Sequence, residues 1–125
     1  MAHGGMPHRV ARTIGDFGEQ FAADHLAARG VQIVERNWRC QLGEIDIIGL
    51  DSNALVFYEV KTRRSARYGS PAEAVTPAKA ARLRRLAARW LSEHPHSANQ
   101  IRVDVLALTM TGEGGTQVEH LRGVS

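Results

Sequence analysis

Two apolar β segments that carry acidic residues constrain the fold of this chain more than any other feature. The stretch GEIDIIGLDSNALVFYEVKTR, residues 43–63, divides into two segments rich in Ile, Leu, Val and Phe around the polar residues Asp51, Ser52 and Asn53. Such segments, separated by a short polar connection, predict two neighbouring antiparallel strands. Both are apolar enough to lie centrally in a sheet, so the acids within them need a physical reason to be there.

The acids of these segments are expected to lie close together. Side chains alternate between the two faces along a strand, which places Glu44 with Asp46, and Glu59 with Lys61. If the strands pair, the carboxylates of Asp46 and Glu59 can lie about 5 Å apart. Two negative charges at that distance repel by roughly 3 kcal/mol at an effective dielectric constant of about 20. A divalent cation, Mg²⁺ or Mn²⁺, would turn this repulsion into binding.

Length and composition bound the class of protein. A chain of 125 residues with 43% hydrophobic residues suffices for one domain with a core of ordinary size. We expect residues 1–12, rich in Gly and His, to form a flexible lead and residues 13–122 to form the domain. No run reaches the roughly 18 apolar residues of a membrane span, and the single cysteine, Cys40, makes no internal disulfide. A cytoplasmic protein without membrane contact is therefore expected.

The order of elements follows from periodicity and end signals. Thr13 and Asp16 have the spacing of a capping box, and Thr76 with Pro77 is typical of a helix start. The expected elements are a helix from 13 to 30, strands over 31–39, 45–50 and 55–60, a helix from 76 to 94, and strands over 101–108 and 117–121. Short connections between the first three strands, and a helical crossover to the fourth, predict an α/β fold with a mixed five-stranded sheet flanked by helices, in the order α-β-β-β-α-β-β.

Basic residues gather after the acidic segments. Between Lys61 and Trp90 the chain has nine basic residues and one acid, Glu73. An acidic pocket beside a basic surface suits a polyanionic substrate, and Tyr68 is available to stack on a base. A solvated helix face and an ordinary surface loop account for the same charges, so both interpretations stay open. The candidate nucleic-acid contacts are Arg63, Arg64, Arg67, Lys79, Arg82 and Arg85.

The ordered set of motifs resembles a known family. GDFGEQFA, GEIDIIG, FYEVKTR, the helix over 77–90 and RVDVLAL look like the YraN family of uncharacterised bacterial proteins, over nearly the whole chain. Glu19, Asp46 and the triplet EVK at 59–61 resemble the PD-(D/E)XK superfamily of restriction-endonuclease-like and Holliday-junction-resolvase-like nucleases. The sequence departs from the superfamily motif at Ile45, which stands where that motif has proline.

This resemblance implies a restriction-endonuclease-like core and a set of roles. Asp46 and Glu59 would hold a divalent metal, Mg²⁺ or Mn²⁺, and Glu19 would complete the site from the first helix. Lys61 would orient or deprotonate the attacking water. The implied substrate is DNA, in branched, flapped or single-stranded form, and a homodimer stays open.

Two functions of different classes remain at this point. The first is a metal-dependent nuclease acting on DNA. The second is a non-catalytic nucleic-acid-binding or assembly module with a vestigial cluster, in which Glu59 and Lys61 form a salt bridge on a solvated sheet face. A further acid, Asp104, is expected either to support the site or to lie at a sheet edge.

Overall fold

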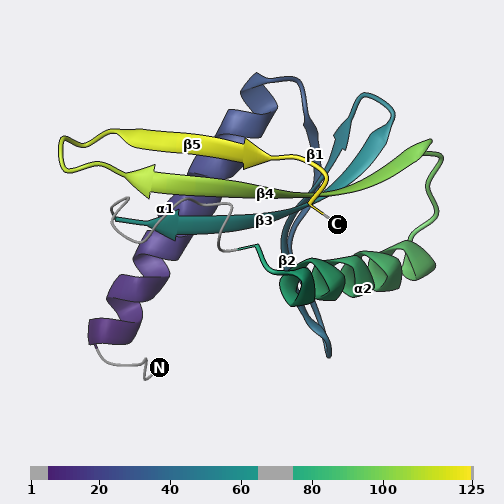
Figure 1. The fold of residues 1–125 in the computed structure, drawn as a ribbon, viewed down its shortest axis with the longest axis horizontal. Coiled ribbons are helices and arrows are strands. Elements are labelled where there is room, and N and C mark those ends of the chain that lie inside the picture. Colours follow the sequence, from purple (N-terminus) through teal and green to yellow (C-terminus); the bar gives the residue numbers. More distant parts are fainter. Residues whose placement is uncertain (1–5, 65–74, 125) are drawn as a thin grey trace.

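The fold is a five-stranded sheet between two helices (Figure 1). The computed structural model describes residues 6–64 and 75–124, with side chains from residue 15 onward. The elements are α1 (Met6–Ala28), β1 (Gln32–Cys40), β2 (Gly43–Asp51), β3 (Ala54–Arg63), α2 (Pro77–Glu93), β4 (Gln100–Met110) and β5 (Thr116–Leu121). The predicted order α-β-β-β-α-β-β is confirmed. Within the described ranges, no helix is long and apolar enough to span a membrane.

The sheet is mixed, as predicted. Its strands lie in the order β1-β2-β3-β4-β5. The pairs β1/β2, β2/β3 and β4/β5 are antiparallel, whereas β3 and β4 are parallel. Two parallel neighbours cannot be joined by a tight turn, and the chain accordingly passes through α2 between them.

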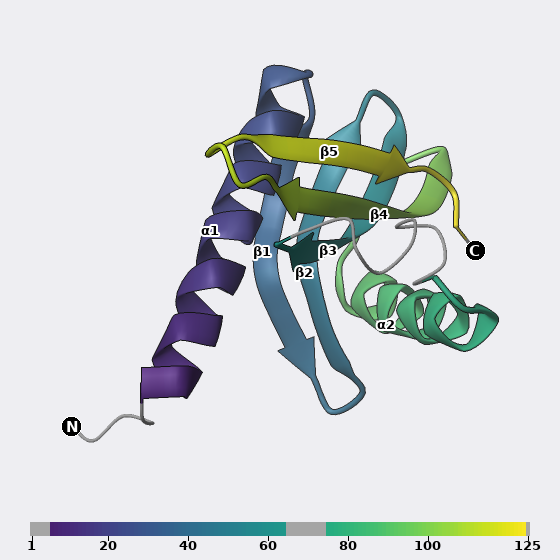
Figure 2. The same ribbon diagram turned by 60° about the vertical axis from the view of Figure 1, so that its left-hand side comes forward.

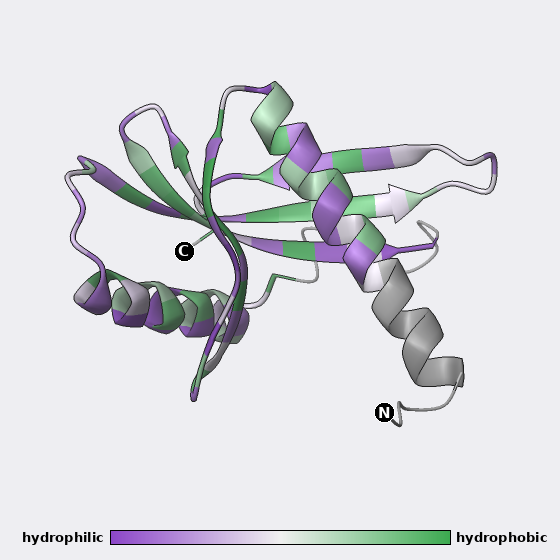
Figure 3. Cartoon of the chain, turned by 180° about the vertical axis from the view of Figure 1, so that it is seen from behind, coloured by the Kyte–Doolittle hydropathy of each residue, from purple (hydrophilic) through white to green (hydrophobic). Residues whose placement is uncertain are grey.

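The two helices cover opposite faces of the sheet (Figures 1 and 2). We call these the α1 face and the α2 face. In Figure 3, hydrophobic and hydrophilic residues alternate along the helices, as expected when one side of each helix is buried. The core of the α1 face includes Ala22, Leu26, Ile47, Val56, Tyr58, Leu106 and Leu108. The core of the α2 face includes Ile45, Ile48, Leu55, Phe57, Leu83, Leu86, Trp90 and Val103.

The start of α2 agrees with the prediction, but the start of α1 does not. Thr76 is the N-cap of α2, and its hydroxyl accepts a hydrogen bond from the backbone N–H of Lys79 at 3.2 Å. The predicted start of the first helix at Thr13 is wrong, because α1 already begins at Met6. The residues between Met6 and Thr13 contain no helix breaker beyond the first turn. A Thr-x-x-Asp spacing also occurs inside helices, so it indicates a helix start only where the backbone before it is not helical.

The β2 strand changes faces in its middle. Ile47 packs in the α1-face core, whereas Ile45 and Ile48 pack in the α2-face core. Regular alternation would place Ile45 and Ile47 on the same face. Asp46 therefore stands where the alternation reverses.

The β1 strand reverses at the same level. Arg36 donates to Gln20 of α1 at 3.0 Å, whereas Trp38 packs against the α2-face core. In the β1/β2 register, Arg36 lies opposite Ile47 and Trp38 opposite Ile45. The two reversals thus face each other across the hairpin. Beyond them the hairpin extends away from the body of the sheet (Figure 2), because the pairing of β2 with β3 ends at Ile47.

Candidate metal centre

Three carboxylates from two elements come together at the point where β2 leaves β3. One oxygen each from Glu19 of α1 and from Glu44 and Asp46 of β2 lie within 4.8 Å of one another. We call these three residues the acid cluster. Two oxygens on opposite sides of one Mg²⁺ are about 4.2 Å apart, so small side-chain movements suffice for the three to share a cation.

Asp46 is the most perturbed acid of the cluster. Its Oδ2 accepts a hydrogen bond from the backbone N–H of Val60 at 2.7 Å. This side chain thus continues the contact between β2 and β3 past their last backbone pair. Burial raises the pKa of Asp46 to about 7; the hydrogen bond from Val60 opposes the rise, and the charges of Glu19, Glu59 and Glu44 add to it. The carboxylate is held where its own negative charge is unfavourable.

Glu19 reaches the cluster because α1 lies unusually close to β3. At Gly18 any Cβ would collide with the hydroxyl of Thr62, so a residue with a side chain would push the helix away. Burial raises the pKa of Glu19; a hydrogen bond with Asn37 lowers it, and the charge of Glu44 raises it again. Glu19 is half-buried, in agreement with its predicted position on the flank of the first helix.

Glu44 is the member of the cluster that the predicted site omits. It forms an ion pair with Arg39, with Oε2 3.5 Å from Nε, but the Arg39 side chain is 77% exposed, so the pair is worth little. The signal that could have found Glu44 was the spacing of two acids, Glu44 and Asp46, within an apolar strand. Alternation had already suggested that these two share a face.

Glu59 and Lys61 lie beside the acid cluster rather than in it. Lys61 Nζ is 3.6 Å from Glu59 Oε2, which is the salt bridge that the alternative interpretation foresaw. Both residues border a small hollow with Lys79 and Leu83 of α2, and thus belong to the α2 face. The charge of Glu59 still raises the pKa of Asp46. The structure therefore brings Glu19 and Asp46 together with Glu44, and the role of Glu59 as a metal ligand stays a prediction.

The predicted nucleic-acid contacts fall into three groups. Arg64 is exposed at the end of β3, while Arg63 donates from Nε to Thr109 Oγ1 at 3.2 Å. Arg67, together with Tyr68, lies outside the described residues. The remaining candidates are exposed on α2: Lys79, Arg82 and Arg85. Their contact with nucleic acid stays a prediction.

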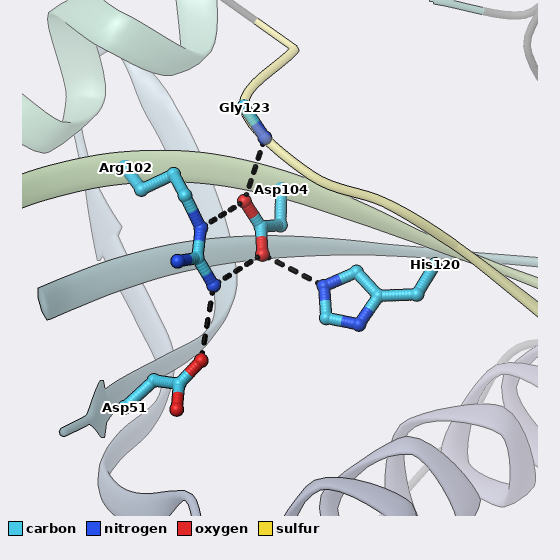
Figure 4. Close-up of polar contacts among 5 residues, drawn as sticks. All are labelled: Asp51, Arg102, Asp104, His120 and Gly123. Atoms are coloured by element: carbon cyan, nitrogen blue, oxygen red, sulfur yellow. Dashed lines mark hydrogen bonds and ion pairs between the residues drawn. The ribbon is translucent and has the colours of Figure 1, made fainter.

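A fully buried acid, Asp104 of β4, is surrounded by donors instead of acids (Figure 4). It accepts two hydrogen bonds from Arg102, at 2.9 and 3.1 Å, one from His120 at 2.7 Å and one from the Gly123 backbone at 3.0 Å. A carboxylate only accepts, so His120 Nε2 carries the proton. Arg102 also donates to Asp51 at 3.1 Å. We call these five residues the Asp104 network.

The Asp104 network favours the charged form of Asp104. Burial alone would raise the pKa of Asp104, but the hydrogen bonds from His120, Arg102 and Gly123 outweigh it and hold that pKa below its usual value. The network joins β4 to β5 and to the residues that follow β5, and it contains no member of the acid cluster.

Comparison with known proteins places the chain in a family. The model of the uncharacterised protein family UPF0102 matches residues 18–108. A UPF0102 protein of Frankia casuarinae is 56% identical over 115 residues, covering 92% of this chain and 98% of its own. UPF0102 proteins of Beutenbergia cavernae and an Arthrobacter species are 54% and 52% identical, each covering 93% of this chain and 98% of its own. The chain therefore belongs to the UPF0102 family, also called YraN, which its motifs resemble.

Proposed function

We propose that this protein is a metal-dependent nuclease that hydrolyses phosphodiester bonds in DNA, with a restriction-endonuclease-like core of the PD-(D/E)XK superfamily. The acid cluster carries this proposal. Its central member, Asp46, has a pKa raised to about 7 among other carboxylates, which is typical of a site that holds a cation. The ordered motifs, which resemble that superfamily, support the same assignment.

The residues present fit a hard divalent cation. Carboxylate oxygens are the ligands that Mg²⁺ and Mn²⁺ prefer, and Mg²⁺ needs few protein ligands because it keeps several waters. Glu19, Glu44 and Asp46 would hold the ion, with Glu59 as a further ligand on the basis of the resemblance. When bound, such an ion supplies positive charge against the negative charge that develops on the phosphodiester oxygens.

The chain's own side chains account for the remaining needs of hydrolysis. A water oxygen must attack phosphorus while the bond to the leaving oxygen breaks. Solvent takes the proton that the attacking water loses and gives the leaving oxygen the proton that it needs. The Lys61 side chain is 53% exposed, so its ammonium is open to a substrate and can orient the water. The exposed Arg64, Lys79 and Arg82 are suited to contact backbone phosphates, which position a nucleic acid without reading its sequence.

Metal titration and cleavage test the proposal together. Calorimetry of the metal-free protein with Mn²⁺ should give heat of binding. Asp46→Asn should remove this heat, whereas Glu119→Gln, which changes an exposed acid of β5, should retain it. Labelled DNA and RNA of several structures, incubated with metal or with chelator, should show metal-dependent cleavage of DNA. Lys61→Ala should abolish cleavage but keep metal binding, with exposed Arg84→Ala as its control. Cleavage that survives in Lys61→Ala or Asp46→Asn protein would contradict the assignment.

A non-catalytic nucleic-acid-binding or assembly module is the second candidate. Two observations favour it: Glu59 and Lys61 neutralise each other at 3.6 Å, and α2 exposes a row of arginines that needs no catalysis to bind a polyanion. This module would bind DNA with an affinity that falls steeply with salt, and it would give no heat with Mn²⁺.

A further inference from the structure

Asn37 has a left-handed backbone conformation, which is unusual inside a β-strand. Among the described residues, Asn37 and Ser52 are the non-glycine residues with positive φ, at 56° and 55°. Ser52 lies in the tight turn between β2 and β3, where such a conformation is usual. Asn37 lies inside β1, where regular strand geometry has negative φ. Asn enters the left-handed region more readily than other residues with a side chain, but the conformation still costs free energy.

The position of Asn37 explains what this conformation achieves. The paired residues on either side, Arg36 with Ile47 and Trp38 with Ile45, place Asn37 directly opposite Asp46. This is the level at which both strands change faces. One left-handed residue in β1 thus coincides with the bend that brings Asp46 out of regular alternation and into the acid cluster.

The side chain of Asn37, in addition to its backbone, contributes to the geometry of the acid cluster. It stands beside Glu19 and lowers the pKa of that residue by stabilising its carboxylate. A carboxylate only accepts hydrogen bonds, so the Asn37 N–H is the group suited to face it. Glu19 is the cluster member that comes from α1, so this contact links the helix to β1 at the level of Asp46.

We propose that Asn37 is a positioning residue of the metal centre: its backbone sets the reversal at Asp46, and its amide holds Glu19 beside Glu44 and Asp46. The inference rests on the proposed function, because it assigns Asn37 a role in binding the metal. Asn37 itself is not a ligand in this scheme. It acts through Glu19.

A matched pair of substitutions tests the role. Glycine adopts positive φ freely, so Asn37→Gly and Ser52→Gly both keep the backbone and remove only a side chain. Both proteins should fold, as judged by circular dichroism. Groups that orient metal ligands typically change metal affinity by 10- to 100-fold when they are removed. We expect the Mn²⁺ affinity, measured by calorimetry, to fall at least 10-fold in Asn37→Gly and to stay unchanged in Ser52→Gly.

A double-mutant comparison with Glu19→Gln distinguishes a positioning role of Asn37 from a general structural effect of its substitution. If Asn37 acts through Glu19, then Asn37→Gly should have no further effect on Mn²⁺ affinity in a Glu19→Gln background. A merely structural role would lower the affinity by the same factor in both backgrounds. A second measurement needs no change at Asn37. In the metal-free protein, the side-chain amide NMR signal of Asn37 should shift in Glu19→Gln and not in Glu119→Gln.

The outcomes distinguish this inference from the proposed function. Absence of Mn²⁺ binding by the wild-type protein would overturn the metal centre, and the role of Asn37 with it. Equal Mn²⁺ affinity of the wild-type and Asn37→Gly proteins would overturn the role of Asn37 alone. An Asn37 amide signal that ignores Glu19→Gln would do the same.

Discussion

Two acids of one sheet, the half-buried Asp46 and the fully buried Asp104, have opposite electrostatic surroundings. Asp104 accepts hydrogen bonds from Arg102, His120 and a backbone N–H, and its pKa is lowered. Asp46 accepts a backbone hydrogen bond from Val60 but has carboxylates around it, and burial with these charges raises its pKa to about 7. Burial opposes the charge in both cases, so the difference comes from the neighbours.

The fold compensates the negative charge of Asp104 and leaves that of Asp46 uncompensated. At Asp104 the protein supplies every donor that a buried carboxylate needs, which makes the acid part of the structure. At Asp46 it supplies further acids, which would be a defect in a purely structural position. A positive ligand from outside resolves that repulsion. The acid cluster, rather than the Asp104 network, is therefore the candidate for function.

Removal of the charge of Asp104 should have the largest effect on stability. Asp104→Asn leaves the buried ends of Arg102 and His120 without their anionic partner, and breaking a buried ion pair typically costs about 3 to 5 kcal/mol. Urea denaturation at pH 7 should show this loss. Folding lowers the pKa of Asp104 below its ordinary value of 3.8. The carboxylate therefore stabilises the folded protein fully above pH 3.8, and this stabilisation is lost as the pH falls through the folded-state pKa. The difference between the two proteins should accordingly narrow below about pH 4. A loss below about 1 kcal/mol at pH 7 would break the comparison.

Removal of the charge of Asp46 should increase the stability of the metal-free protein. Asp46→Asn keeps an acceptor for Val60 and removes the repulsion. The rise in pKa from 3.8 to about 7 corresponds to about 4 kcal/mol for a fully buried group, which we halve to about 2 kcal/mol because the side chain is partly exposed. A carboxyl group whose pKa is raised by folding does not change the free energy of unfolding below its unfolded-state pKa. Above its folded-state pKa it lowers that free energy by the full amount. Metal-free Asp46→Asn protein should therefore be more stable than wild type at pH 8 and equal to it near pH 4. A less stable variant at pH 8 would refute the interpretation.

Removal of one donor from the Asp104 network should have the smallest effect. The His120 ring lies 5.9 Å from the Tyr58 ring, so His120→Phe keeps an aromatic contact while it removes the hydrogen bond to Asp104. A hydrogen bond to a charged group is worth about 1.5 to 3 kcal/mol, and Arg102 remains to compensate, so we expect a loss of about 1.5 kcal/mol in urea denaturation. Exposed Glu119→Gln on the same strand serves as control. An equal loss in both variants would indicate that the effect comes from β5 and not from Asp104.

Much of the fold could be predicted from the sequence because its signals are local. Apolar segments bounded by short polar connections indicated the strands, and Thr76 with Pro77 indicated the start of α2. The start of α1 could not be read in this way. The Thr-x-x-Asp pattern at Thr13 indicates a possible cap, but only the backbone decides whether the helix begins there, and it begins at Met6.

The candidate site was predictable only in part, because its geometry breaks the rule on which the prediction depends. Strict alternation treats β2 as regular, so it pairs Asp46 with Glu59 across the strands. The reversal of faces at Asn37 and Asp46 is a tertiary feature that alternation does not contain. The structure gathers the predicted Glu19 and Asp46 with Glu44, and the role of Glu59 stays a prediction. The donors of Asp104 were equally hidden, because His120 meets it only through the register of β4 with β5.

The attachment of the three cluster acids to the body of the protein is unequal. Asp46 is tied to β3 by Val60, and the helix that bears Glu19 is seated on β3 at Gly18. Glu44 lies farther along the hairpin, in a part of β2 that pairs with β1 alone. The hairpin beyond Asp46 packs instead on α2, where Trp38 and Cys40 contact the α2-face core. Glu44 therefore depends on α2 for its position, whereas Asp46 and Glu19 depend on β3.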